Sequence, residues 1–391
     1  MRSNTAHQVQ AGRIKLGGGA LPVVSYAKRL RNRVIAKRAS DLWNVSSVVV
    51  RSATVDGGGI RLSARHTERI MESYRAAKDA QRAAATAYHP AEHWQLNIDR
   101  GFAALSGSIR EDSREDVEAY LANFRQYDLG IEWEAHLDFG KREVRKDYVK
   151  LLTQLYQLWR LQNAGEPLTY LCRPESGNPK ATYELSGKPV TAGSFTMNYY
   201  TSQQRRLIEG LERPVIGEIG GGYGKMAYYL VRDMPAFCYL DFDLPETLAL
   251  ITYYLFSCFP ERRFLLYGEG DLSESALSKY DFILLPNFCI DALPDLSCDL
   301  FVNKNSLGEM NKETVETYLR HVDRTCRGHF WHTNHELVPC TMSVDPGLRS
   351  SQFALDPKHF ELLYRTVDFP SFLMHKGQAD IVTYCYRRTR L

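Results

Sequence analysis

A short glycine-rich stretch between two apolar runs constrains the fold of this chain more than any other feature. Residues 215–219 suit a buried strand, residues 220–224 (Gly-Gly-Gly-Tyr-Gly) a tight turn, and the residues after them a helix. Glycines let the backbone bend sharply and approach a ligand, since no Cβ intervenes. The N–H groups at the start of the helix would face the same ligand. The pattern predicts a cofactor-binding strand–turn–helix unit, with the ligand against Gly220, Gly222 and Gly224.

Two classes of cofactor use such a turn, and the spacing separates them. A dinucleotide fingerprint of the type G-x-G-x-x-G would place a glycine where this chain has Lys225. The pattern here is E-x-G-x-G-x-G, with Glu218 at the end of the strand. It resembles the first motif of the class I S-adenosylmethionine-dependent methyltransferases. The resemblance implies S-adenosyl-L-methionine as cofactor and S-adenosyl-L-homocysteine as product; a glycine turn in an unrelated α/β protein is the alternative.

A second apolar run ends in a carboxylate one strand–helix–strand unit further along. Residues 236–243 close on Asp243. A carboxylate there can accept hydrogen bonds from both ribose hydroxyls of an adenosyl group. Asp241 is the rival, because period-two alternation in a strand directs it to the same face. An N-terminal cap for the helix that begins near Pro245 is compatible with the ribose role.

The features before the glycine turn deepen the resemblance. A Gly-Asn-Pro segment at 177–179, a turn-rich stretch up to Val190 and a helix with Tyr199 and Tyr200 are similar to the sugar O-methyltransferase group within the class I enzymes. The resemblance implies that these two tyrosines contact the methionine end of the cofactor. Packing of the helix is the alternative role for both.

Two strand-like runs compete to cover the adenine ring. Residues 263–267 are followed by Asp271, which could accept a hydrogen bond from the exocyclic amine. Residues 281–287 end in Asn287, followed by Phe288, which could lie against the ring. The sugar methyltransferase resemblance favours Asn287 and Phe288, and Asp271 remains the alternative.

The next two strands end in polar groups that could serve the reaction. In an open parallel sheet, ligands bind beyond the carboxyl ends of the strands at the switch point. We expect Asn303 to contact the cofactor, Asn305 and Ser306 to contact the substrate, and Glu309 to deprotonate a hydroxyl or hold a divalent cation. A first-turn carboxylate of the following helix is the other role for Glu309.

Histidines in the later of these strands are the other candidate bases. His335 and His332 are the candidates, and His335 lies nearer the end of its strand. A metal site of His332, His335 and Glu336 is not favoured, because side chains alternate along a strand and three successive ligands cannot share one face.

The chain divides by composition into three parts. Residues 1–60 are basic and flexible, with no acidic residue before Asp41, and could touch an anionic membrane surface. Residues 61–194 show helical periodicity and form a lid, substrate or oligomerisation domain. Residues 195–391 form the methyltransferase domain, for which the resemblance implies a Rossmann-like α/β sheet of seven mostly parallel strands with the last one antiparallel.

Composition limits the remaining possibilities. The eight cysteines include no C-x-x-C pair, and no apolar run is long enough to span a bilayer, so we expect a cytoplasmic protein with reduced thiols. The net charge of +3 and the lack of a basic, aromatic groove argue against nucleic acid as a partner. We expect a homo-oligomer acting on a sugar, glycoside or other metabolite in natural product biosynthesis. N- or O-methylation of a peptide or other secondary metabolite, a nicotinamide-dependent oxidoreductase and a non-catalytic cofactor-binding protein are the alternatives.

Overall fold

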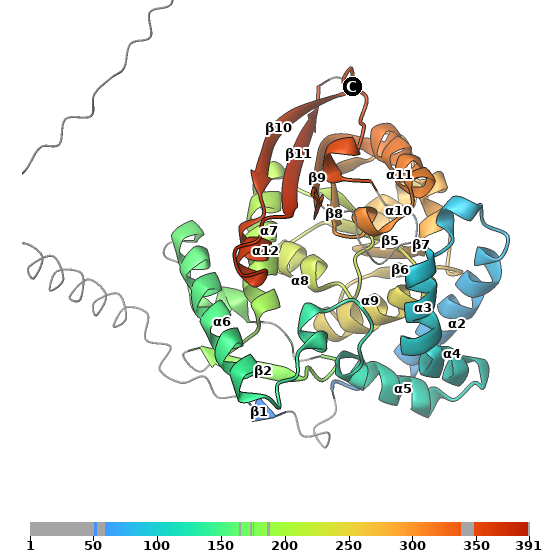
Figure 1. Ribbon diagram of the computed structural model, residues 1–391. Helices are drawn as coiled ribbons and strands as arrows, with labels where there is room; N and C mark the ends of the chain where they lie inside the picture. The colour runs from blue at the N-terminus through green and yellow to red at the C-terminus, as the bar shows by residue number, and fades with distance from the viewer. Residues whose placement is uncertain are drawn as a thin grey trace, which may run out of the picture. The chain divides into compact units, whose positions relative to one another are not determined.

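The computed structural model describes residues 51–52, 59–163, 166–172, 174, 176–185, 188–337 and 348–389 (Figure 1). Most of the basic segment predicted at residues 1–60, with its proposed membrane contact, lies outside these residues. None of the helices in the described ranges combines the length and apolarity that crossing a bilayer requires.

A mixed sheet of eight strands dominates the described part of the chain. The strand order is β10-β11-β9-β8-β4-β5-β7-β6. In chain order the strands are β4 (Val215–Ile219), β5 (Cys238–Asp243), β6 (Phe264–Leu266), β7 (Phe282–Pro286), β8 (Cys298–Lys304), β9 (Cys326–His335), β10 (Phe360–Val367) and β11 (Ile381–Arg388). Strands β4 to β9 pair in parallel, and β11 is antiparallel to both β9 and β10.

The prediction of seven strands was wrong by one edge strand. The antiparallel last strand is present as β11, but β6 adds an eighth strand beyond β7. Phe264, Leu265 and Leu266 are all buried, and they pair in parallel register with the first half of β7. Burial of this apolar triplet extends the sheet, because its backbone groups pair with those of β7.

Helices cover both faces of the sheet, which explains why β4, β5 and β7 consist almost entirely of buried residues. One face packs against α2 (Ala64–Gln81), α7 (Ala192–Leu207), α8 (Lys225–Val231) and α9 (Pro245–Cys258). The other face packs against α10 (Glu274–Lys279) and α11 (Lys312–Thr325). Because strand side chains alternate, Glu218, Asp241 and Asp243 project to the face that carries α8 and α9.

The first half of the chain is mainly helical, and several of its elements rest on the second half. Helix α2 contacts α9 and β6, and α6 contacts α7 (Figure 1). The other elements before α7 are η1 (Thr86–Tyr88), α3 (Glu92–Gly101), α4 (Ala103–Arg110), α5 (Arg114–Asn123), η2 (Phe124–Gln126), η3 (Trp133–His136), α6 (Arg142–Gln162), η4 (Leu168–Leu171) and a small sheet of β1 (Arg51–Ser52), β2 (Ala181–Leu185) and β3 (Lys188–Val190). The short elements after β7 are η5 (Asn287–Ala292), η6 (Leu307–Glu309), η7 (Ser350–Gln352) and α12 (Phe369–Met374).

Candidate active site

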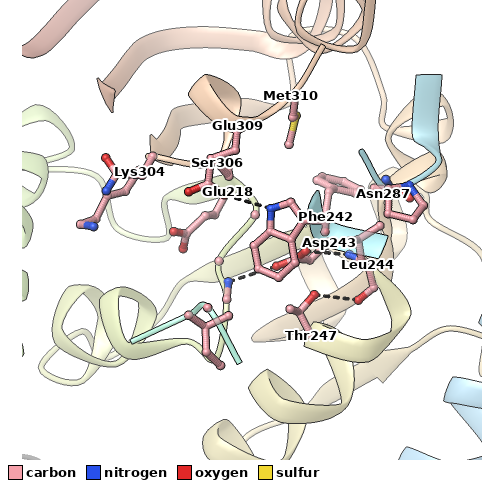
Figure 2. Close-up of a pocket in the computed structure, with 18 of the residues that line it drawn as sticks. Glu218, Phe242, Asp243, Leu244, Thr247, Asn287, Lys304, Ser306, Glu309 and Met310 are labelled. Atoms are coloured by element: carbon pink, nitrogen blue, oxygen red, sulfur yellow. Dashed lines mark hydrogen bonds between the residues drawn. The ribbon is translucent and has the colours of Figure 1, made fainter. Parts of the chain in front are cut away.

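A cavity of about 350 Å³ opens beyond the carboxyl ends of β4, β5 and β8 (Figure 2). Strands β5, β6 and β7 all lie on one side of β4, and the chain then crosses to β8 on the other side of β4, so this is the topological switch point of the sheet. The lining comes from two parts of the chain, between residues 87 and 136 and between residues 197 and 318.

The sequence-predicted site residues divide into two groups in the structure. The cavity is lined by Glu218, Gly220, Gly222, Asp243, Asn287, Asn305, Ser306 and Glu309. Those outside its lining are Tyr199, Tyr200, Gly224, Phe288, Asn303, His332 and His335.

The glycine turn after β4 has the backbone conformation that its sequence predicts. Gly220, Gly222 and Gly224 all have positive φ, and a Cβ added to Gly220 would lie 2.4 Å from the hydroxyl oxygen of Ser306. The Gly220 N–H donates to the Phe242 carbonyl over 3.0 Å, which holds the turn against the end of β5. Gly224 is the N-cap of α8 and packs near Ile251 instead of lining the cavity.

Two carboxylates of β5 fix the turn, and one of them faces the cavity. Asp243 accepts hydrogen bonds from Gly222 N–H over 3.0 Å and from its neighbour Leu244 N–H over 2.7 Å. Burial raises the pKa of Asp243 to about 6. Asp241 accepts from Gly221 N–H over 2.9 Å, is fully buried and does not line the cavity. Of the two rivals, Asp243 is therefore the one that a ligand can reach.

Glu218 places a second carboxyl group on the cavity, and this one is buried. Only 2 % of Glu218 is exposed, and the hydroxyl of Tyr239 donates to it. Burial, with a smaller effect from the nearby Asp243, raises the pKa of Glu218 to about 7. A cationic ligand would offset the cost of ionising a carboxyl group in this environment.

Two side chains at the end of β8 and in the turn after it bind to β4, the strand before the glycine turn, which we call the glycine strand. Asn303 and Ser306 both donate to the Ile219 carbonyl, each over 2.8 Å. Asn303 also accepts from Asn334 over 2.8 Å and is fully buried. Asn303 therefore supports the site from behind the cavity wall, while Ser306 and Asn305 face the cavity.

Glu309 lies in the cavity wall beside an aromatic residue from the first half of the chain. The indole N–H of Trp94 donates to Glu309 Oε2 over 2.9 Å, and His93 Nε2 lies 3.9 Å from the same oxygen. Sequence patterns gave no indication of this pairing, since helix α3 and η6 are distant in the chain.

At the far end of the cavity, Asn287 anchors the first half of the chain. Its Nδ2 donates to the Tyr88 carbonyl over 2.8 Å, and its Oδ1 accepts from Phe288 N–H over 3.0 Å. Thr314 makes a matching bond to the Ala87 carbonyl over 2.9 Å. The alternative adenine contact, Asp271, is exposed and lies outside the lining.

The two predicted catalytic histidines lie away from the cavity lining. His332 is fully buried and stacks on Tyr384 with the ring centroids 5.1 Å apart, and burial lowers its pKa to about 3. His335 pairs through Nδ1 with Asp380 over 2.6 Å. Within the described residues, no group of three or more His, Cys, Asp or Glu side chains has the arrangement of a metal site.

The two predicted tyrosine contacts also lie outside the lining. Tyr200 is buried and donates its hydroxyl to Asp368 over 2.6 Å. Tyr199 is half-buried and packs edge-on against Tyr200, with their ring centroids 5.8 Å apart. Both tyrosines are thus placed as packing residues of α7, which is the alternative role given for them.

Glu132 joins the segment that carries Trp133 to α8, the helix that follows the glycine turn. It accepts two hydrogen bonds from Arg125, one from the Tyr223 hydroxyl over 2.9 Å and one from Lys225 Nζ over 2.8 Å. The adjacent Trp133 lines the cavity. This wall was not predicted from the sequence, in which the tryptophan at 133 and the His-Trp pair at 93–94 were the available signals.

No protein-family model and no curated protein matches the chain. Among solved structures, the chain is similar to the glycopeptide N-methyltransferase MtfA complexed with S-adenosyl-L-methionine (12% identity, TM-score 0.33, 48% of this chain and 86% of that one). It is also similar to the Burkholderia thailandensis 1,6-didemethyltoxoflavin-N1-methyltransferase (14%, TM-score 0.32, 50% and 79%) and to the [4+2]-cyclase SpnF (13%, TM-score 0.33, 49% and 80%). Similarities of this size assign no function to the chain.

Proposed function

We propose that this protein transfers a methyl group from S-adenosyl-L-methionine to a hydroxyl oxygen of a sugar or a glycosylated small molecule. The observation that carries the proposal is one cavity in which Glu218 and Asp243 flank a glycine turn, opposite a wall of aromatic side chains. One buried and one partly buried carboxyl group suit a donor that combines a positive charge with ribose hydroxyls.

The methyl donor would lie along the ends of β4 and β5. The Asp243 carboxylate accepts the N–H groups of Gly222 and Leu244 and also hydrogen bonds with the Thr247 side chain, which leaves about one acceptor position for a ribose hydroxyl. Leu244 and Met310 supply apolar surface for the adenine ring, and Asn287 Oδ1 has capacity to accept its amine. Glu218 would lie near the positively charged end of the donor.

The acceptor would lie against the wall built by the first half of the chain. Trp94 and Trp133 offer flat apolar surface of the kind that packs on the C–H faces of a sugar ring. Glu309 and Ser306 provide polar groups for its hydroxyls. The donor supplies an electrophilic methyl group, and the protein contributes by aligning the acceptor oxygen with it.

The first experiment is calorimetry with S-adenosylhomocysteine and, separately, with NAD. The proposal expects binding of the adenosyl ligand; binding of the dinucleotide alone would overturn it and favour a nicotinamide-dependent oxidoreductase. Mass spectrometry would then screen sugar nucleotides, glycosides, phenols and short peptides for a gain of one methyl group. Methylation confined to peptides or amines would show that the acceptor class is wrong while the reaction type stands.

A further inference from the structure

A lysine that the sequence analysis passed over ends the strand beside the glycine strand. Lys304 is the last residue of β8, directly after Asn303, which is in register with Ile219 at the end of β4. Its side chain lines the cavity. Figure 2 shows Lys304 on the side of Glu218 and Ser306, with Asn287 on the opposite side of the view. Lys304 is thus at the end of the cavity where the methyl group would be transferred.

The Lys304 amine is held in place without a carboxylate within ion-pair distance among the described residues. With its amide oriented to satisfy both ends, Asn305 accepts from Lys304 Nζ through Oδ1 and donates to the Thr333 carbonyl through Nδ2, each over 3.2 Å. Nζ also lies 6.0 Å from the centroid of the Tyr200 ring. A neutral amide and an aromatic ring are thus the nearest groups that position the amine.

The surroundings of Lys304 favour the neutral form of its amine more strongly than water does. Burial, supported by the positive charge of Lys225 on α8, lowers the pKa of Lys304. Asp368, which caps α12, Glu309 on η6 and Glu218 on β4 act in the opposite direction, and Glu218 itself stays protonated up to about pH 7 because burial raises its pKa. A cationic methyl donor in the same cavity would lower the pKa of Lys304 further.

We propose that Lys304 is the proton acceptor for the acceptor hydroxyl. This inference rests on the proposed function. The nitrogen lone pair takes the hydroxyl proton as the oxygen forms its bond to the methyl carbon. The carbon–sulfur bond breaks, its electron pair stays on sulfur, and the positive charge moves from sulfur to the lysine ammonium, which later releases the proton to water.

Another role for an amine at this position would be to hold a carboxylate of the methyl donor. The two roles make opposite predictions. A carboxylate-binding lysine must stay charged, and its loss weakens donor binding. A proton acceptor must be neutral before the reaction, and its loss leaves donor binding intact while turnover falls.

The first test measures the amine itself, without an acceptor. Trace labelling with acetic anhydride from pH 6 to pH 11, followed by peptide mass spectrometry, gives the pH at which each lysine becomes reactive. Lys312, whose side chain is 69% exposed, is the internal reference. The proposal expects Lys304 to become reactive at a lower pH than Lys312, with a further decrease when S-adenosylmethionine is present. Equal midpoints would overturn it.

The second test compares Lys304→Met and Lys304→Arg with Lys312→Met. Both Lys304 variants should bind S-adenosylhomocysteine within about threefold of the unaltered protein in calorimetry. With an acceptor found by the screen, kcat should fall by about 10²–10⁴ with little change in KM, since this is the usual contribution of a general base. Arginine should not restore turnover, because it stays protonated. Lys312→Met should behave as the unaltered protein.

The outcomes separate this inference from the proposed function. An unaltered protein that binds no S-adenosylhomocysteine overturns both. A protein that binds it and methylates an acceptor, but whose Lys304→Met variant turns over normally, overturns only the role of Lys304. Loss of S-adenosylhomocysteine binding in Lys304→Met assigns the lysine to the donor carboxylate instead.

Discussion

Trp94 donates its indole N–H to Glu309 over 2.9 Å, and this bond joins the helical first half of the chain to the turn that follows β8. The two residues face one cavity from opposite halves of the sequence. This side-chain contact therefore fixes α3 relative to the turn after β8, and it can be removed without altering Glu218, Asp243 or the glycine turn.

Replacing Trp94 by phenylalanine keeps the aromatic surface and removes the N–H donor. We expect methyl transfer to fall about tenfold, because a hydrogen bond to a charged group contributes about 1.5–3 kcal/mol, while S-adenosylhomocysteine affinity stays within about twofold. Glu309→Gln completes a double-mutant cycle measured by kcat/KM. If the effects of the two substitutions were simply additive, the bond would have no role in placing the acceptor.

Asp243→Asn should weaken binding of S-adenosylhomocysteine about tenfold to hundredfold. The amide keeps the size of the side chain, but one of its two terminal groups becomes a donor, which cannot accept a ribose hydroxyl. Asp271→Asn is the matched control, since Asp271 is exposed and lies outside the lining. Calorimetry measures the affinity of both variants for S-adenosylhomocysteine. Weaker binding in the Asp271 variant alone would move the adenosyl site away from β5.

Binding of S-adenosylhomocysteine should strengthen as the pH rises from 5 to 8. Burial raises the pKa of Asp243 to about 6 and that of Glu218 to about 7, so both are largely protonated at pH 5 in the free protein. A ligand that favours the ionised carboxylates must displace protons, which makes affinity rise by about tenfold per pH unit for each group involved, up to its pKa.

Calorimetry in two buffers of different ionisation enthalpy counts the protons released. In the same window the ligand-free protein should lose stability as the pH rises, since each carboxyl group binds its proton more tightly in the folded state than in the unfolded state. A pH-independent affinity with no proton release would contradict a role for these carboxylates.

Gly220→Ala should destabilise the protein and impair ligand binding together. The residue has φ of +73°, and an added Cβ would lie 2.4 Å from the Ser306 hydroxyl oxygen, so both backbone strain and a clash oppose the substitution. We expect a loss of about 1–3 kcal/mol in the free energy of unfolding. Gly107→Ala, in α4 with open space around it, should instead stabilise by up to about 1 kcal/mol. Denaturant titration of both variants checks the difference in sign.

His332→Phe should make the protein less sensitive to acid. Burial lowers the pKa of His332 to about 3, whereas an unfolded histidine titrates near 6.5. The unfolded state therefore gains a proton between those values, and the unaltered protein loses about 1.4 kcal/mol of stability per pH unit on acidification through this window. Urea titrations at pH 6 and pH 5 should show a shallower loss in the variant. Parallel slopes would mean that His332 is charged in the folded protein.

The glycine turn and its two carboxylates were predictable because their chemistry is local. Positive φ at Gly220 and an acidic residue at the end of each strand follow from a few consecutive residues. The same local rules placed Ser306 and Glu309 beyond the end of β8, although they gave no way to distinguish Asn303, which supports the wall from behind, from Asn305, which faces the cavity.

What the sequence left open depends on contacts between distant residues. The segments that carry Trp94 and Trp133 are bonded to the second half through Asn287, Thr314 and Lys225, and no spacing rule predicts such pairs. The histidines of β9 were predicted as bases because they lie near the carboxyl end of a strand of the sheet. Their strand lies two positions from the glycine strand, beyond β8, which sequence alone does not measure.

Asn287 and Thr314 hold the first half of the chain through the backbone carbonyls of Tyr88 and Ala87. Backbone carbonyls are present whatever the side chain is, so these anchors do not depend on the identity of His89, Pro90, Ala91 and Trp94, which line the cavity. New acceptor preferences can thus arise by substitution within one short loop and helix start, while the glycine turn that would hold the donor stays as it is.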